Sequence, residues 1–147
     1  MPKARNKEEL DRATEHLKYE FTMLMAVAHA MASGMSTGGW LTNALLEAFV
    51  IHFRALVDFF YPPPQRKPDD VLATDFFVDP TEWERMRPPL TDELKRGRAR
   101  AHKEVAHLTY ARQDVTPESK PWPFVEIANQ MHALMEAFNE GVKKNEQ

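Results

Sequence analysis

The sequence predicts an all-α protein, a four-helix up-and-down bundle with a long, partly helical connection between the second and third helices. Apolar residues recur at helical spacing in the long segments, and no segment makes a convincing strand. Of the 147 residues, 43% are hydrophobic and 28% are charged, which is the ordinary composition of a globular protein. We therefore expect residues 1–147 to form a single domain, with residues 1–6 and 144–147 frayed.

The first helix is expected to begin at Lys7, because Asn6 is a good helix cap. It runs to about Ser33, since its apolar residues keep helical spacing at Leu10, Leu17, Phe21, Leu24 and Val27. The glycine-rich stretch 34–39 then forms a turn into the next helix.

The second helix is expected from about Trp40 to Tyr61 and is nearly apolar all round, which is typical of the central helix of a bundle. Glu47, Arg54 and Asp58 are the exceptions, and their spacing places them on one face. Charged groups inside a bundle need partners. We expect Glu47, Arg54 and Asp58 to form either an internal ion-pair network that fixes helix register or a second shell of contacts that orients groups on the third helix.

The connection after the second helix begins with a proline-rich break at residues 61–68. Short helical pieces are expected at 71–77 and 79–87. Because this segment carries several large aromatic residues, we expect it to be ordered and to lie over one end of the bundle.

The third helix is expected to start at Thr91 and to run to about Gln113. Gly97 lies in its narrow, alanine-rich apolar stripe, and small residues there allow another helix to come close. The last helix is expected from about Phe124 to Lys143.

The third helix also carries the residues best suited to chemistry. Arg100 and His107 are seven residues apart and therefore lie on nearly the same face of a regular helix, with Lys103 and Glu104 between them. His102 points well away from His107. A histidine can transfer a proton near neutral pH, and an arginine or lysine can hold a phosphate. The combination suits RNA cleavage with the ribose 2′-hydroxyl as nucleophile, which needs no metal ion and no cofactor.

The local charge agrees with an RNA substrate, although the whole chain has a formal net charge of −3. Cations outnumber nearby acids around this helix, and we assign Arg98 and Lys103 to substrate binding. Glu104 is a further candidate, beside Glu47, Arg54 and Asp58, for orienting the groups that carry out the chemistry. The competing interpretation is that this is simply a basic helix face in contact with solvent.

The segment from Arg100 to His107, RAHKEVAH, resembles the signature of the HEPN superfamily. That signature is an arginine followed, after four to six residues, by a histidine, often with a polar residue directly after the arginine. Here six residues intervene, and the polar residue, His102, comes one place late. The resemblance implies a four-helix domain in which Arg100 and His107 are catalytic, with His102 close to the polar position.

The same resemblance implies the partners. Many HEPN domains are dimeric, metal-independent ribonucleases of toxin–antitoxin or phage-defence systems, and others only bind RNA or proteins. We therefore expect a homodimer that binds RNA, with an antitoxin or another protein as a further partner.

A metal-binding bundle is one alternative. Glu104 and His107 form a Glu-x-x-His step, which di-iron bundles use once on each of two helices. Only one copy is present, because Asn129 stands where a second histidine would follow Glu126. Glu47 is the candidate for the opposite carboxylate.

A non-enzymatic helical homodimer or partner-binding module is the other alternative, with the surface candidates Trp40, Trp83, Trp122 and Phe76. The chain has no cysteine, and serine nucleophile elbows, phosphate-binding loops and dinucleotide-binding glycine patterns do not occur. No signal peptide is recognisable, and charged or polar residues interrupt the longest apolar stretches. We expect a cytoplasmic protein that does not span a membrane.

Overall fold

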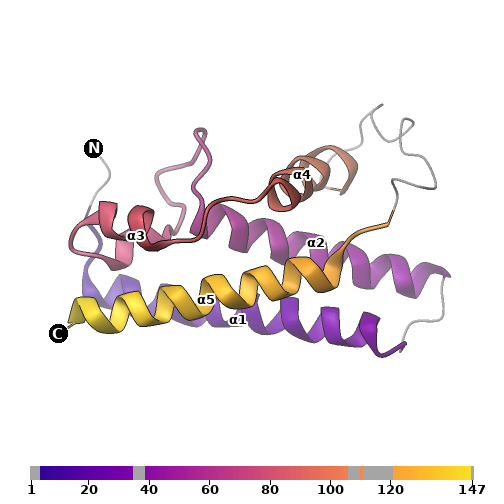
Figure 1. Cartoon of the computed structure of the whole chain (residues 1–147), viewed down its shortest axis with the longest axis horizontal. Helices are drawn as coiled ribbons and strands as arrows, with labels where there is room; N and C mark the ends of the chain where they lie inside the picture. Colours follow the sequence, from indigo (N-terminus) through magenta and orange to yellow (C-terminus); the bar gives the residue numbers. More distant parts are fainter. Residues whose placement is uncertain (1–3, 35–38, 106–109, 111–120, 147) are drawn as a thin grey trace.

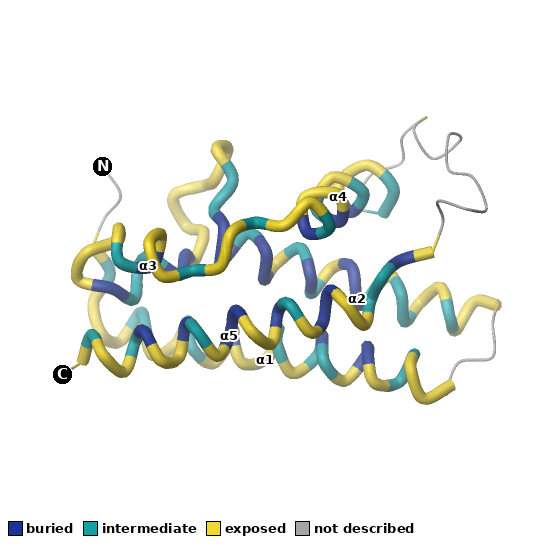
Figure 2. The backbone as a smooth tube through the Cα atoms, in the orientation of Figure 1, coloured by how far each residue is buried: buried dark blue, intermediate teal, exposed yellow. Residues whose placement is uncertain are grey.

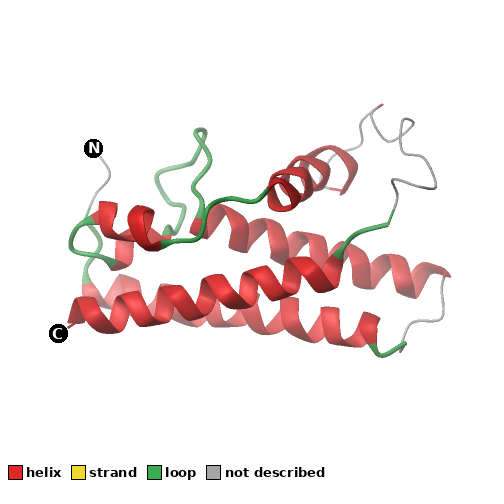
Figure 3. Cartoon of the chain, in the orientation of Figure 1, coloured by secondary structure: helices red, strands yellow, loops and turns green. Residues whose placement is uncertain are grey.

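The computed structural model describes residues 4–34, 39–105, 110 and 121–146, and this part of the chain is helical without a strand (Figures 1 and 3). The all-α prediction is therefore confirmed for the described residues. They form the α-helices α1 (Lys7–Ala32), α2 (Gly39–Phe60), α3 (Pro80–Met86), α4 (Asp92–Arg100) and α5 (Phe124–Glu146), the 3-10 turn η1 (Ala73–Phe76) and the π-helical turn η2 (Ala101–Val105).

Three long helices, α1, α2 and α5, lie lengthwise against one another (Figure 1). α2 runs antiparallel to α1, and α5 runs in the same direction as α2. The fourth position is taken by α4, which ends at Arg100 and continues as the π-helical turn η2. A regular helix from Thr91 through these residues was expected and is not what forms. The described residues thus show three long α-helices, α1, α2 and α5, and two short ones, α3 and α4.

Helices α1 and α4 begin where their capping residues, Asn6 and Thr91, predicted. The side chain of Asn6 accepts a hydrogen bond from the Glu9 backbone N–H, and Glu9 accepts one from the Asn6 N–H, each at 2.9 Å. Thr91 caps α4 by accepting from the Leu94 N–H at 3.2 Å. These caps satisfy backbone donors that have no partner inside the helix, and the predicted starts of both helices are confirmed.

Residues near both ends of the described chain make hydrogen bonds to the connection between α2 and α4. Arg5 donates to the Pro68 carbonyl at 2.7 Å, beside the start of α1. At the other end Asn145 accepts from the Val78 N–H at 3.0 Å and donates to Glu82 at 2.8 Å. α5 consequently extends to Glu146, beyond the expected end at Lys143.

Aromatic packing holds the long connection in place. Phe138 of α5 lies at the centre of a cluster in which its ring centroid is 5.3–6.2 Å from those of Phe59, Phe60, Phe76, Phe77 and Trp83. Edge-to-face contacts at these distances add to the burial of apolar area. The expectation of an ordered connection over one end of the helices is confirmed, and Figure 2 shows buried positions along this connection.

α4 approaches α2 closely because Gly97 faces Phe53. A Cβ atom at Gly97 would lie 2.9 Å from the ring of Phe53, which is fully buried. Only glycine fits without displacing a core side chain. The predicted role of this small residue in helix contact is confirmed.

α2 is only half enclosed, although its composition suggested a fully central helix. Its C-terminal half supplies much of the core, whereas Trp40 is 80% exposed and Ile51 is 59% exposed. By length and composition α2 also qualifies as a helix able to cross a membrane, a property that core helices of soluble proteins share. What differs from expectation is the outward side of α2, where Trp40 and Ile51 stay exposed among the residues that the structure describes.

Candidate functional site

Arg98 joins α4 to the end of α2. Its guanidinium donates to the Val57 carbonyl at 3.0 Å and to the Tyr61 carbonyl. These acceptors lie at the end of α2, where the Val57 carbonyl also accepts from the Tyr61 N–H at 2.8 Å. Arg98 therefore anchors two helices and is turned toward the protein, which differs from the expected phosphate-binding side chain.

Asp58 completes this anchor. Its Oδ1 lies 3.2 Å from Nε of Arg98, and both atoms are buried, but their relative orientation does not make a hydrogen bond. Burial raises the pKa of the Asp58 carboxyl and the nearby Asp70 adds to this, while Arg98 and Arg54 oppose it. The contact is thus an ion pair within a partly buried charge group.

The charged stripe on α2 is divided between two environments. Asp58 contacts α4 through Arg98. This contact joins the charged stripe of α2 to the segment that carries the candidate site, and it also fixes the register of the two helices. Arg54 is half-buried beside Asp58, and Glu47 is exposed near the start of α2. Among the described residues, neither Arg54 nor Glu47 makes a hydrogen bond or a close ion pair.

Arg100 contacts Glu104, Pro121 and Trp122 among the described residues. Its Nε donates to Glu104 at 2.7 Å, and its Nη1 donates to the Pro121 carbonyl at 3.1 Å. The guanidinium carbon lies 4.1 Å from the ring centroid of Trp122. A guanidinium stacked on an indole ring and paired with a carboxylate is well positioned. Glu104 therefore contacts Arg100 directly.

The π-helical turn η2 begins directly after Arg100. Such turns interrupt the regular spacing of side chains and are frequent at functional sites. His102 and Lys103 are both exposed on it. His107 lies outside the described residues. The argument that Arg100 and His107 share a face assumed a regular helix, and it does not extend through η2.

An exposed basic surface results on one side of this segment. We call it the basic face of α4 and η2, and it consists of Lys95, Arg96, His102 and Lys103. On the opposite side, Leu94, Gly97 and Ala101 are buried against the helices below. The arrangement can bind polyanions by multiple charge contacts.

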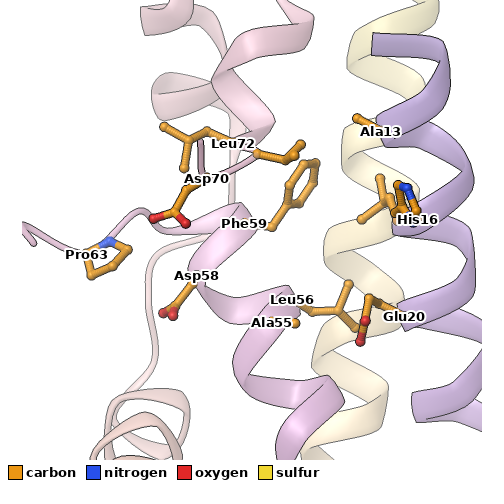
Figure 4. A pocket seen from close by; sticks show the side chains of 12 residues that line it. Ala13, His16, Glu20, Ala55, Leu56, Asp58, Phe59, Pro63, Asp70 and Leu72 are labelled. Atoms are coloured by element: carbon orange, nitrogen blue, oxygen red, sulfur yellow. The ribbon is translucent and has the colours of Figure 1, made fainter. Parts of the chain in front are cut away.

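Two cavities flank α2 near this segment. One, of about 290 Å³, lies between α2 and η2 and is lined by Val50, Ile51, Arg54, Ala55, Asp58, Ala101 and Val105. The other, of about 300 Å³, lies between α1, α2 and the connection (Figure 4). Its walls are mainly apolar, and Figure 4 places Asp58 and Asp70 on the other side of Phe59 from His16 and Glu20.

The metal-binding alternative requires a cluster of ligands. Among the described residues, no three histidine, aspartate or glutamate side chains are grouped so as to hold a metal ion. Glu104 is engaged with Arg100, and Glu47 lies exposed on α2.

Sequence reasoning missed two contacts. Trp122 was considered only as a surface residue, yet it is buried beneath Arg100. His52 of α2 and Glu20 of α1 pair across the helix interface, with Nδ1 and Oε2 2.5 Å apart. The polar groups of these two contacts lie among apolar residues, and this was the signal that the sequence offered. The signal does not identify which residue each polar group contacts.

No family model matches this chain, and no curated protein and no solved structure shows significant similarity to it. The resemblance to HEPN domains therefore stays a prediction from the sequence segment Arg100 to His107.

Proposed function

We propose that this protein is HEPN-like and binds single-stranded RNA along the basic face of α4 and η2, where it cleaves the RNA without a metal ion. The observation that carries the proposal is the exposure of four basic side chains on one side of the segment that contains the HEPN-like signature. Phosphate contacts dominate the affinity of proteins for nucleic acids. A toxin–antitoxin or defence system, with an antitoxin as partner, is the setting that the resemblance implies.

The cleavage step follows from the residue types. The ribose 2′-oxygen attacks the adjacent phosphorus and loses its proton to a histidine, assigned to His107 by the resemblance. The bond from phosphorus to the 5′-oxygen breaks, and the leaving oxygen takes up a proton. The products are a cyclic 2′,3′-phosphate and a free 5′-hydroxyl.

Arg100 is the residue that would stabilise the extra negative charge on the phosphate. Its present anionic partner is Glu104, and a guanidinium binds carboxylate and phosphate in similar geometry. The role of Arg100 therefore involves exchanging Glu104 for the phosphate while the stack on Trp122 maintains its position.

RNA affinity should depend on the basic face. We expect Arg96→Glu to weaken binding of a fluorescent single-stranded RNA by about tenfold or more at low salt, because it replaces a cation by an anion beside the phosphates. Fluorescence anisotropy measures this, with Lys18→Glu as the matched control because Lys18 is an exposed lysine on α1. Equal affinities for the two variants would contradict the proposed surface.

A second function has a specific observation in its favour. The outward side of α2 exposes Trp40 and Ile51, which is unusual for a helix of this apolarity. We therefore also propose that this chain binds a protein partner through α2, independently of RNA.

A further inference from the structure

The cavity between α1, α2 and the connection combines apolar walls with ionisable groups that are mostly acidic. Its volume of about 300 Å³ lies at the lower end of the range of small-molecule sites. The ionisable residues that line it are His16, Glu20, Asp58 and Asp70. Among the described residues, no lysine and no arginine lines this cavity, which we call the acidic cavity.

Asp70 is the carboxylate of the acidic cavity that lacks a cationic partner. Its Oδ2 accepts from the Lys67 backbone N–H at 2.7 Å, and it makes no close ion pair with the described residues. Glu20 is already paired with a histidine of α2, and Oδ1 of Asp58 lies against Arg98. The uncompensated negative charge therefore lies at the Asp70 end of the cavity.

Asp58 and Asp70 repel each other at this end. Figure 4 shows both carboxylates on the same side of Phe59. Burial is the main cause of the raised pKa of Asp58, and the charge of Asp70 adds to it, although Arg98 and Arg54 oppose both. The Asp58 side chain is still 32% accessible beside Arg98. A cation between the two carboxylates would offset their repulsion.

We propose that the acidic cavity binds a small organic ammonium ion, with the charged group beside Asp70 and Asp58 and the apolar body against Phe59 and Leu72. An ammonium group donates charge-assisted hydrogen bonds to carboxylate oxygens. Burial of the alkyl or aromatic body removes apolar surface from water. The site is separate from the basic face of α4 and η2, because none of the residues that line it belongs to α4 or η2.

Other small ligands fit the acidic cavity less well. Among the described residues, no three histidine, aspartate or glutamate side chains are grouped to hold a metal ion, and a bare ion would leave the apolar walls in contact with water. The carboxylates repel phosphates and other anions. At the far end Glu20 already has a partner, so the cavity calls for one ammonium group rather than two.

Isothermal titration calorimetry of the full chain with three probes of similar shape tests the proposal. We expect phenethylammonium to bind with a dissociation constant of about 1 mM or lower. The neutral phenethyl alcohol should bind about tenfold more weakly, because it lacks the charge, and the anion phenylacetate should not bind. Equal affinities for the ammonium ion and the alcohol, or no binding of the ammonium ion, would overturn the proposal.

Three variants locate the site. Asp70→Asn should weaken phenethylammonium binding about fivefold or more and leave the alcohol unchanged, because the amide keeps an acceptor for Lys67 but loses the charge. Asp69→Asn is the matched control, since Asp69 is an exposed neighbour that does not line the cavity. Ala13→Leu, which fills the cavity from α1, should weaken both ligands.

Circular dichroism should show all three variants folded. Phenethylammonium affinities that are the same in Asp70→Asn and Asp69→Asn would contradict the role of Asp70. Binding that Ala13→Leu leaves unchanged would place the ligand outside the acidic cavity and overturn the proposal. Neither result depends on RNA, so the test is independent of the proposed ribonuclease activity.

Discussion

Trp83→Ala should lower the free energy of unfolding by about 3–5 kcal/mol, the usual cost of removing a large buried aromatic side chain. Trp83 is fully buried, and its ring lies 5.8 Å from both Phe60 and Phe138. Its indole N–H also donates to the Phe60 carbonyl at 3.0 Å. Losing both the ring and the donor detaches α3 from α2 and α5. Urea unfolding followed by circular dichroism measures the change.

Two further variants separate the contributions of ring and donor. Trp83→Phe keeps an aromatic ring but removes the donor, so we expect a smaller loss than in the alanine variant. Val78→Ala, at a solvent-exposed position, should stay within about 0.5 kcal/mol of wild type. If Trp83→Ala were as stable as Val78→Ala, the aromatic cluster would not be what holds the connection.

Arg98→Met should cost about 2–3 kcal/mol at neutral pH, because hydrogen bonds from a charged group to two carbonyls at the end of α2 are lost. The neighbouring Arg96→Met, at an exposed position, should change the free energy of unfolding by less than about 0.5 kcal/mol. Equal stabilities of these two variants would contradict the anchoring role of Arg98.

The cost of Arg98→Met should also depend on pH. Burial already raises the pKa of Asp58 above 3.8, and removing the cation that opposes this raises it further. A carboxyl with a raised folded-state pKa favours the folded state at low pH, and this contribution is lost as the pH rises through that pKa. The deficit of Arg98→Met should therefore grow between about pH 4 and neutrality.

Asp58→Asn supplies the control for this pH dependence. Asparagine does not titrate, so in the Asp58→Asn background the cost of Arg98→Met should be nearly constant with pH. Denaturant unfolding at several pH values measures all four proteins of the cycle. A cost that still grows with pH in the asparagine background would assign the effect to another group.

The sequence predicted the parts of the fold that depend on local signals. Asn6 and Thr91 cap their helices because a short polar side chain can satisfy free backbone donors wherever it precedes a helix. The connection between α2 and α4 is ordered because its aromatic residues need burial, and Phe138 provides the contact. Such features need only composition and spacing.

The parts that it did not predict depend on partners distant in sequence. A basic residue in a helix can face water, phosphate or another helix, and only packing placed Arg98 against α2. The turn η2 departs from regular spacing without a proline or glycine in Ala101–Val105. Spacing placed Glu104 on the face of Arg100, where the two side chains pair, but it could not find the stack on Trp122, which is distant in sequence.

RNA cleavage by the purified protein in excess chelator tests the central claim most directly. We expect wild type to cleave single-stranded RNA to cyclic 2′,3′-phosphate ends, and His107→Ala and Arg100→Ala to lose this activity while remaining folded. Lys18→Glu should cleave like wild type. Absence of cleavage across a broad RNA panel, or cleavage that both alanine variants retain, would contradict the assignment of a metal-independent ribonuclease.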